Sequence, residues 1–248
     1  MHGSTRCRKI SGRFGRIIIS DFSDDGEHYP FPDPESSDAQ GLLAIGGDLS
    51  SGRLLSAYRQ GIFPWFEPGC PILWWSPNPR LILYPQQFKL SRSLTKSLKQ
   101  AHELRIDSAF NAVIQACATV DHRENNTWIS REMQTAYINL FDMGFAHSVE
   151  IWREQRLIGG LYGISLGKAF FGESMFHYER DASKMAMYYL CQMLSRQNFE
   201  FIDCQLPTAH LMSMGAVIIS RKEFMHRLQQ ALQYPALQGN WAHLADCI

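Results

Sequence analysis

The chain has 248 residues, 45% of them hydrophobic, and its 24 Lys and Arg residues balance its 24 Asp and Glu residues. This length suits one large domain or two smaller ones, and the hydrophobic content is sufficient for a packed core. No apolar run is long enough to span a bilayer, so we expect a cytoplasmic protein with no membrane partner. The neutral net charge means that any contact with nucleic acid must come from a local cluster.

The N-terminal segment 1–16 is basic and contains no acid; its charged residues are Arg6, Arg8, Lys9, Arg13 and Arg16. It lacks the apolar run of a secretory signal, so we predict a disordered basic extension.

From 17 to 78 the chain is rich in Gly, Pro and aromatic residues, and we predict a small N-terminal domain. One clear helix runs from Ser51 to Gln60, with Ser50 or Ser51 as N-cap and Gly61 as its end. Prolines between Pro64 and Pro79 then interrupt any regular structure.

From 79 to 248 the pattern is that of a second, regular domain. We predict helices over 91–101, 110–120 and 130–143, then a meander of strands over 147–152, 157–165 and 168–175. A helix capped by Asp181, a strand around Asp203, a short helix near Leu211, a strand over 217–219 and a final helix from Arg221 follow. With a first strand over 81–84, this predicts an α+β fold with a mixed, mostly antiparallel sheet.

Two apolar strands of this domain end in polar groups. One strand, 169–176, contains Glu173, and the other, 199–206, contains Asp203 and Gln205. Alternation along a strand predicts that Asp203 and Gln205 share one face. Buried polar side chains are costly unless they are satisfied, so three of them at neighbouring strand ends suggest a site, although bonds to loop backbone would also satisfy them.

Six cysteines and nine histidines are scattered through the chain without a C-x-x-C pair, so neither a disulfide framework nor a metal site is indicated, and we expect the cysteines to be free buried thiols. Cys204 lies beside the polar pair, which suggests a nucleophile. Its strand phase points it to the opposite face, and no His is spaced to activate it, so we expect a buried free thiol.

A basic stripe lies on the predicted helix over 91–101. Arg92, Lys96 and Lys99 fall at i, i+4 and i+7, on one face, within a stretch that runs from Arg80 to Arg105 and holds one acid. A solvated surface helix gives the same pattern, but the missing i+4 acidic partners favour a contact with a phosphate backbone.

Several longer motifs resemble the leucyl/phenylalanyl-tRNA–protein transferases, in that family's order and spacing, from about Phe31 to about Leu232. They are Gly41–Ser50 (GLLAIGGDLS), Gly61–Phe66 (GIFPWF), Trp74–Pro77 (WWSP), Thr127–Arg131 (TWISR), Phe171–Phe176 (FGESMF) and Ile202–Gln205 (IDCQ). The resemblance implies a GNAT-like acyltransferase domain. It also implies transfer of Leu or Phe, with Met as a further candidate, from aminoacyl-tRNA to proteins with N-terminal Arg or Lys, which marks them for N-end-rule degradation. No cofactor or metal is implied.

The resemblance also implies roles for individual residues. Asp203 and Gln205 would act on the attacking amine and the oxyanion, and Glu173 would hold an ammonium group of donor or acceptor. Two further sets are implied: Leu161, Phe170, Met175 and Ile202 as the aminoacyl pocket, and Tyr58, Trp65 and Trp128 as the site of the tRNA 3′-adenosine. Ordinary core packing is the alternative for both sets.

Three other functions remain open. A CoA-dependent N-acyltransferase needs a glycine-rich turn for the pyrophosphate, but the turn over 177–184 has no glycine and carries Glu179 and Asp181. A peptidoglycan-type aminoacyl transferase would use the same donor with a cell-wall acceptor. A non-catalytic tRNA-binding module would use only the basic stripe and the aromatic residues.

Overall fold

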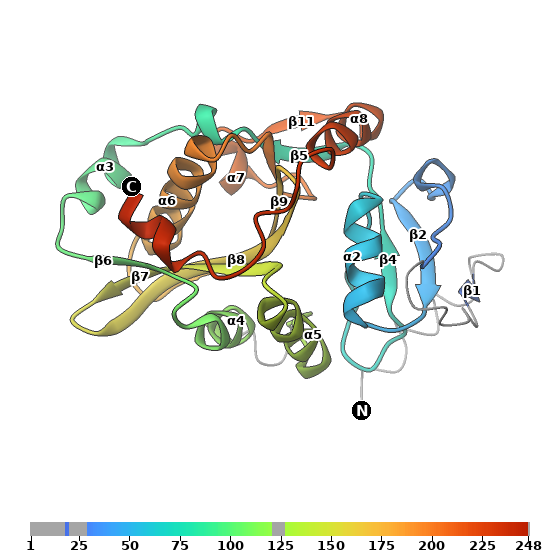
Figure 1. The fold of residues 1–248 in the computed structure, drawn as a ribbon, viewed down its shortest axis with the longest axis horizontal. Coiled ribbons are helices and arrows are strands. Elements are labelled where there is room, and N and C mark those ends of the chain that lie inside the picture. The colour runs from blue at the N-terminus through green and yellow to red at the C-terminus, as the bar shows by residue number, and fades with distance from the viewer. Residues whose placement is uncertain (1–17, 20–28, 121–126, 248) are drawn as a thin grey trace. The chain divides into compact units, whose positions relative to one another are not determined.

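The computed structural model describes residues 18–19, 29–120 and 127–247, and the chain divides into two compact units between Asn78 and Pro79 (Figure 1). The predicted basic extension, 1–16, lies outside the described residues. None of the helices in the described part combines the length and apolar character of a membrane-spanning helix.

The first unit is a four-stranded sheet with one helix. Its strands β1 (Ile18–Ile19), β2 (Leu42–Gly46), β3 (Phe63–Pro64) and β4 (Leu73–Trp75) lie in the order β1-β2-β4-β3. Helix α2 (Ser51–Arg59) begins at Ser50, whose hydroxyl accepts the Arg53 N–H, and ends before Gly61 at a φ of 71°. The predicted helix is therefore confirmed, whereas the short strands around it were not predicted.

The second unit contains a seven-stranded sheet in the order β11-β5-β10-β9-β8-β7-β6. The strands are β5 (Arg80–Leu83), β6 (Glu103–Ile106), β7 (Ala146–Arg153), β8 (Arg156–Leu166), β9 (Ala169–His177), β10 (Phe201–Asp203) and β11 (Val217–Ile219). Strand β10 pairs parallel with β9, and the other neighbours in this sheet pair antiparallel. The predicted α+β fold with a mixed, mostly antiparallel sheet is confirmed, although β6 was not predicted.

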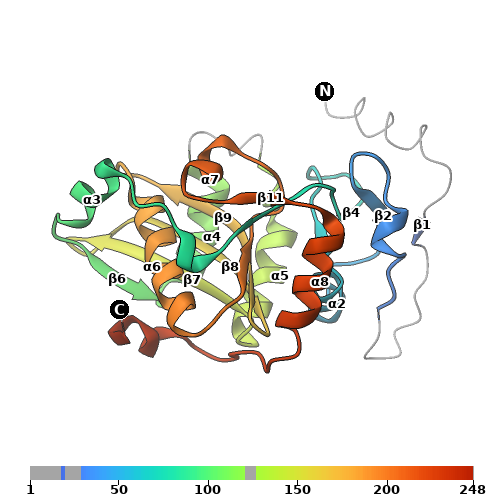
Figure 2. The same cartoon turned by 90° about the horizontal axis from the view of Figure 1, so that it is seen from above.

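Helices cover both faces of this sheet (Figures 1 and 2). Helices α4 (Phe110–Thr119) and α5 (Arg131–Asp142) lie on one face, and α6 (Ala182–Arg196) lies on the other. The described residues also form helices α3 (Arg92–Leu98), α7 (Ala209–Ser213) and α8 (Arg221–Ala231), with 3-10 segments at Pro34–Ser36, Pro85–Gln87 and Ala242–Cys247. The main core lies under α6, where Leu190 and Leu194 pack with Trp241.

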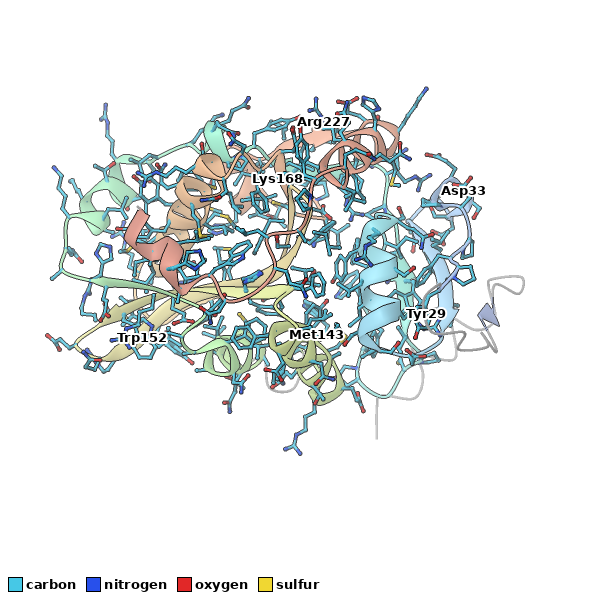
Figure 3. The ribbon with its side chains drawn as sticks, in the orientation of Figure 1. Tyr29, Asp33, Met143, Trp152, Lys168 and Arg227 are labelled. Atoms are coloured by element: carbon cyan, nitrogen blue, oxygen red, sulfur yellow. The ribbon has the colours of Figure 1, made fainter. Side chains whose placement is uncertain are left out.

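A buried carboxylate ties α4 to the sheet. Glu150 on β7 accepts the backbone N–H groups of Ser108 and Ala109, which precede α4, and the hydroxyl of Ser148. The indole of Trp152, labelled in Figure 3, donates to the same carboxylate at 3.2 Å. Because α4 has no side-chain cap of its own, Glu150 satisfies its N-terminus from the neighbouring strand.

The cysteines only partly match the expectation. Cys117, Cys191 and Cys204 are free and buried. Cys70, by contrast, is disulfide-bonded, so the expectation of free thiols is wrong there. Among the described residues no group of three His, Cys, Asp or Glu side chains is arranged to hold a metal ion.

Candidate functional site

Strands β9 and β10 separate in the middle of the sheet. They pair only from Ala169–Phe171 to Phe201–Asp203, yet β9 continues to His177. Beyond Asp203 the chain bonds instead to β5, through Cys204 N–H to the Leu81 carbonyl and Leu81 N–H to the Gln205 carbonyl. Residues 172–175 of β9 are accordingly half-buried, whereas Phe171 and Phe176 on either side are buried. We call this opening, bounded by 172–175 and 204–206, the fork.

Glu173 lies on one side of the fork, at a β-bulge. Gly163 pairs with Gly172 and Tyr162 pairs with Ser174, so Glu173 is the extra residue on β9. A bulge re-aims a side chain without ending the strand. The fully buried Tyr137 of α5 donates its hydroxyl to Glu173 Oε2 at 2.7 Å, which fixes the carboxylate on the α5 face of the sheet. Sequence reasoning missed Tyr137 because no motif marks a helix residue whose partner lies 36 residues away.

Tyr162 packs beside this pair, with its ring centroid 5.5 Å from that of Tyr137. Burial raises the pKa of the Tyr162 hydroxyl well above its usual value, and the nearby Glu173 charge and Cys117 raise it further. The phenol therefore stays neutral at physiological pH.

Asp203 lies on the other side of the fork and is fully buried. Arg80 of β5, itself 1% exposed, donates Nε to Asp203 Oδ1 at 2.9 Å and Nη2 to Oδ2 at 2.6 Å. The guanidinium also lies 4.4 Å from the ring centroid of Phe224. This bidentate geometry is the strongest that a carboxylate and an arginine can form. Arg80 thus belongs to the interior and not to the basic surface stretch in which the sequence placed it.

The second partner of Asp203 is the backbone of Gln205, whose N–H donates to Asp203 Oδ1 at 3.0 Å. Strand β10 ends at Asp203, and Gln205 has a φ of 55°. Strand alternation therefore does not extend to Gln205, and it no longer predicts that the two side chains share a face. Instead, Asp203 stabilises a left-handed backbone at Gln205 that would otherwise be unfavourable for a residue other than glycine. Gln205 is half-buried, between buried Cys204 and exposed Leu206.

Cys204 points into the core under α6, on the face opposite to Asp203, as predicted. Burial raises the pKa of its thiol well above the usual value, and the Asp203 charge and Cys191 add to the shift. A protonated thiol in an apolar core is a poor nucleophile, so the geometry opposes a catalytic role.

The four residues predicted to form the aminoacyl pocket do lie together. Leu161, Phe170 and Ile202 belong to the core under α6, each at most 2% exposed, and half-buried Met175 packs against them. The bulge explains how Phe170 and Met175 share a face although five positions separate them. Glu173, however, lies on the opposite face of the sheet, where it is bonded to Tyr137.

The three aromatic residues predicted for the adenosine differ in exposure. Tyr58 is fully buried in the first unit, so its ring packs as core and the expected stacking surface is absent there. Trp65 is 42% exposed, with Trp75 fixed beside it by a 2.7 Å bond from the Trp75 indole to the Trp65 carbonyl. Trp128 belongs to the second unit and is half-buried.

The basic stripe is exposed. Helix α3 ends at Leu98, earlier than predicted, and Lys99 is its C-cap. Arg92, Lys96 and Lys99 are all exposed, whereas Leu94 on the opposite side is buried.

The turn before α6 also differs in one respect from the prediction. Asp181 precedes the helix in a left-handed conformation, and its carboxylate bonds to Ser93 and Ser97 of α3 instead of capping α6. Glu179 pairs with Arg153. Two carboxylates therefore flank the α6 N-terminus, which opposes binding of a pyrophosphate there.

Sequence comparisons with known proteins agree on one family. The family described as "Leucyl/phenylalanyl-tRNA protein transferase" matches residues 82–229, and its N-terminal domain matches residues 47–78. A leucyl/phenylalanyl-tRNA–protein transferase of Legionella pneumophila (strain Corby) is 63% identical over 215 residues, which cover 87% of this chain and 97% of the relative. The corresponding protein of Nitrosomonas eutropha is 54% identical over 215 residues, covering 86% and 92%.

Among solved structures, a conserved protein of unknown function from Staphylococcus epidermidis is similar with a TM-score of 0.42 and 10% identity, covering 72% of this chain and 68% of that chain. A TM-score this low carries no argument about fold or function.

The buried pair predicts a large stability effect. Asp203→Asn leaves the Arg80 guanidinium buried without its carboxylate, and should reduce the free energy of unfolding by about 3–5 kcal/mol. The matched control is the exposed pair of Arg105 and Glu103, whose side chains are 27% and 53% exposed. Glu103→Gln should change the free energy of unfolding little, because ion pairs at the surface contribute little. Urea unfolding of both variants checks this, and equal costs would show that Asp203 and Arg80 do not form the buried pair.

Proposed function

The chain belongs to the leucyl/phenylalanyl-tRNA–protein transferase family, and from that membership we propose how its second unit performs aminoacyl transfer. It is an aminoacyltransferase that takes aminoacyl-tRNA and a protein as substrates. We further propose Leu and Phe as donor residues, with Met as a third, and proteins with N-terminal Arg or Lys as acceptors. The reaction takes place in the cytoplasm and marks the acceptor for N-end-rule degradation.

The reaction needs positioning more than activation. The α-amino nitrogen of the acceptor attacks the ester carbonyl of the donor, an amide bond forms, and the 3′-oxygen of the tRNA leaves with a proton. The ester is already activated, so the protein has to supply a neutral amine in line with the carbonyl and a donor for the oxyanion. An α-amino group has a pKa of about 8, so a fraction of it is neutral at pH 7.

Gln205 is the candidate catalytic residue. Its side chain is half-buried at the fork, and its carboxamide offers an oxygen to the attacking amine or an N–H to the oxyanion. Asp203 is fully buried and bonded to Arg80, so it is poorly placed to touch a substrate. The observation that carries the proposal is the 3.0 Å bond from Gln205 N–H to Asp203 Oδ1, which makes Asp203 a positioning residue for Gln205.

Glu173 is the candidate ammonium-binding residue. Its half-buried carboxylate accepts the Tyr137 hydroxyl on the α5 face of the sheet, opposite the apolar core under α6. Gln205 lies on the other side of the fork. We assign it to the α-ammonium of the donor or to the basic end of the acceptor. A carboxylate held by a buried hydroxyl binds such a cation without first losing rotational freedom.

The donor side chain would enter between β9 and β10. Met175 is half-buried at this position, and its flexible thioether adapts to both Leu and Phe. Leu161, Phe170 and Ile202 lie behind it as the apolar floor. Branching at Cβ stiffens χ1, so Val and Ile should fit less well.

The tRNA would be held in two places. We assign the exposed cations Arg92, Lys96 and Lys99 to backbone phosphates, since an acceptor stem is recognised largely through its shape and phosphates. Exposed Trp65 and half-buried Trp128 are the candidate stacking surfaces for the 3′-adenosine, with buried Tyr58 supporting the first unit from inside.

One assay tests the proposed function against its alternatives. The protein is incubated with Leu-tRNA and an Arg-initiated peptide, and the product is read by mass. A peptide heavier by one leucine residue is expected, and acylation from acetyl-CoA or of a cell-wall peptide is not. Competition between Leu-tRNA and Val-tRNA of one acceptor sequence should favour Leu by tens to hundreds of fold, since a misplaced methyl costs ~1–3 kcal/mol. Equal use of Val and Leu would reject the donor pocket.

Gln205→Ala should lower single-turnover transfer by at least ~100-fold, as expected for loss of a positioned catalytic group. Only the side chain is removed, so the unfolding midpoint should change little. Gln233→Ala, at an exposed position after α8, is the control and should transfer normally. Rapid single-turnover transfer by Gln205→Ala would exclude the proposed role.

Tyr137→Phe keeps the ring and removes the hydroxyl that holds Glu173. A hydrogen bond to a charged group is worth ~1.5–3 kcal/mol, so kcat/KM for the aminoacyl donor should fall by roughly tenfold or more. Tyr162→Phe is the control, because the buried Tyr162 hydroxyl has no hydrogen-bond partner in the described structure. Steady-state kinetics measure kcat/KM of the two variants. Equal decreases in both would mean that the Tyr137 hydroxyl does not hold Glu173 for binding.

A further inference from the structure

One carboxylate bonds helix α3 to the turn before α6. Asp181 Oδ2 accepts the hydroxyl of Ser93 at 2.8 Å and that of Ser97 at 3.1 Å, and Oδ1 accepts Lys184 Nζ at 3.0 Å. The Asp181 side chain is 5% exposed. A carboxylate on the turn before α6 is therefore bonded to two hydroxyls of a helix that lies more than 80 residues earlier in the chain.

Asp181 has an uncommon backbone conformation. Its φ of 62° and ψ of 0° are left-handed, a region that few residues other than Gly, Asn and Asp adopt. The side chain makes no capping bond to α6, so its carboxylate is available for the three bonds to Ser93, Ser97 and Lys184.

The bonds also set which face of α3 points outward. Ser93 and Ser97 are one turn apart, and the helix face that carries them also buries Leu94. Arg92, Lys96 and Lys99 lie on the exposed side. Burial raises the pKa of the Asp181 carboxyl, but the bonds from Ser93, Lys184 and Ser97 outweigh it, and the pKa lies below the usual value. The carboxylate is therefore ionised at physiological pH.

We propose that Asp181, Ser93 and Ser97 form an anchor that positions α3 for binding tRNA phosphates. The anchor touches neither substrate nor reacting atoms; it keeps the three cations of α3 in one orientation. The inference rests on the proposed contact between α3 and tRNA. With seven residues α3 is too short to be stable alone, so its orientation depends on packing and on this anchor.

The anchor predicts a particular salt dependence. If the bonds are lost, only a fraction of the molecules holds the α3 cations in the binding orientation. The apparent affinity for tRNA is then reduced in proportion to that fraction. Each correctly oriented molecule still makes the same phosphate contacts, so the slope of log affinity against log salt stays the same. Removal of a cation, by contrast, lowers that slope by roughly 0.7 to 0.9 per contact.

The experiment uses the full chain and uncharged leucine-accepting tRNA. The double variant Ser93→Ala/Ser97→Ala should bind about three- to tenfold more weakly, with an unchanged salt slope and an unchanged kcat at saturating aminoacyl-tRNA. Hydrogen exchange of the α3 amides should accelerate while that of β8 does not. The control is Thr95→Ala on the same helix, whose hydroxyl bonds to the Ser91 carbonyl and not to Asp181, and it should behave as wild type.

Asp181→Asn is the second variant. Asn accepts the left-handed conformation and keeps the size of the side chain, so folding should be retained while the charge is lost. It should reproduce the weaker binding and the faster α3 exchange. Unchanged tRNA affinity in both the Asp181 and the double serine variants would overturn the anchor, as would a loss of protection spread evenly over the whole second unit.

A triple charge reversal at Arg92, Lys96 and Lys99 separates this inference from the proposed function. If the reversal lowers the salt slope but the serine variant leaves affinity unchanged, α3 binds tRNA and the anchor is wrong. If the reversal changes nothing, the proposed tRNA contact is wrong. The proposed role of the anchor in tRNA binding then falls with that contact, whatever the hydrogen exchange of α3.

Discussion

The bidentate pair between Arg80 and Asp203 is the interaction on which the candidate site depends. It joins β5 to β10 inside the protein, at a point where both side chains are almost completely removed from water. A lone charge there would be very costly, so the two residues constrain each other's strands as well as neutralising each other. The same carboxylate also accepts the Gln205 N–H, and this bond holds the chain in the left-handed turn that leads β10 away from β9. The fork is a consequence of that turn.

On the β9 side of the fork, the bulge at Glu173 determines how the side chains are arranged. It places a carboxylate on the α5 face and Met175 on the α6 face within two residues, which regular alternation does not do. A carboxylate and an apolar side chain are thereby brought to one opening. In the proposed function this combination suits an aminoacyl ester, whose α-ammonium and side chain are attached to the same carbon atom.

Local signals were sufficient to predict most of the fold and to select Glu173, Asp203 and Gln205 as candidates. Ser50, Ser91 and Ser130 each cap a helix, and the period-two pattern located β7 to β9. The geometry of the site was less predictable because it depends on interactions distant in sequence. Nothing near Asp203 shows that its partner is Arg80, 123 residues away, and nothing near Glu173 shows Tyr137. The bulge and the positive φ at Gln205 invalidated the alternation argument, since that argument holds only within an uninterrupted strand. The one indication in the sequence was Arg80 itself, because an arginine at the start of an apolar strand suggests that a buried acidic partner exists elsewhere in the chain.

The central claim is that Gln205 meets the substrates while Asp203 stays with Arg80. The most direct measurement is a crystal structure of the protein with a non-hydrolysable aminoacyl-adenosine and an Arg-initiated peptide. The account predicts the peptide amine within hydrogen-bond distance of the Gln205 carboxamide, the ammonium of donor or acceptor on Glu173, and an intact pair between Arg80 and Asp203. An amine in contact with the Asp203 carboxylate, or donor and peptide bound away from the fork, would contradict it.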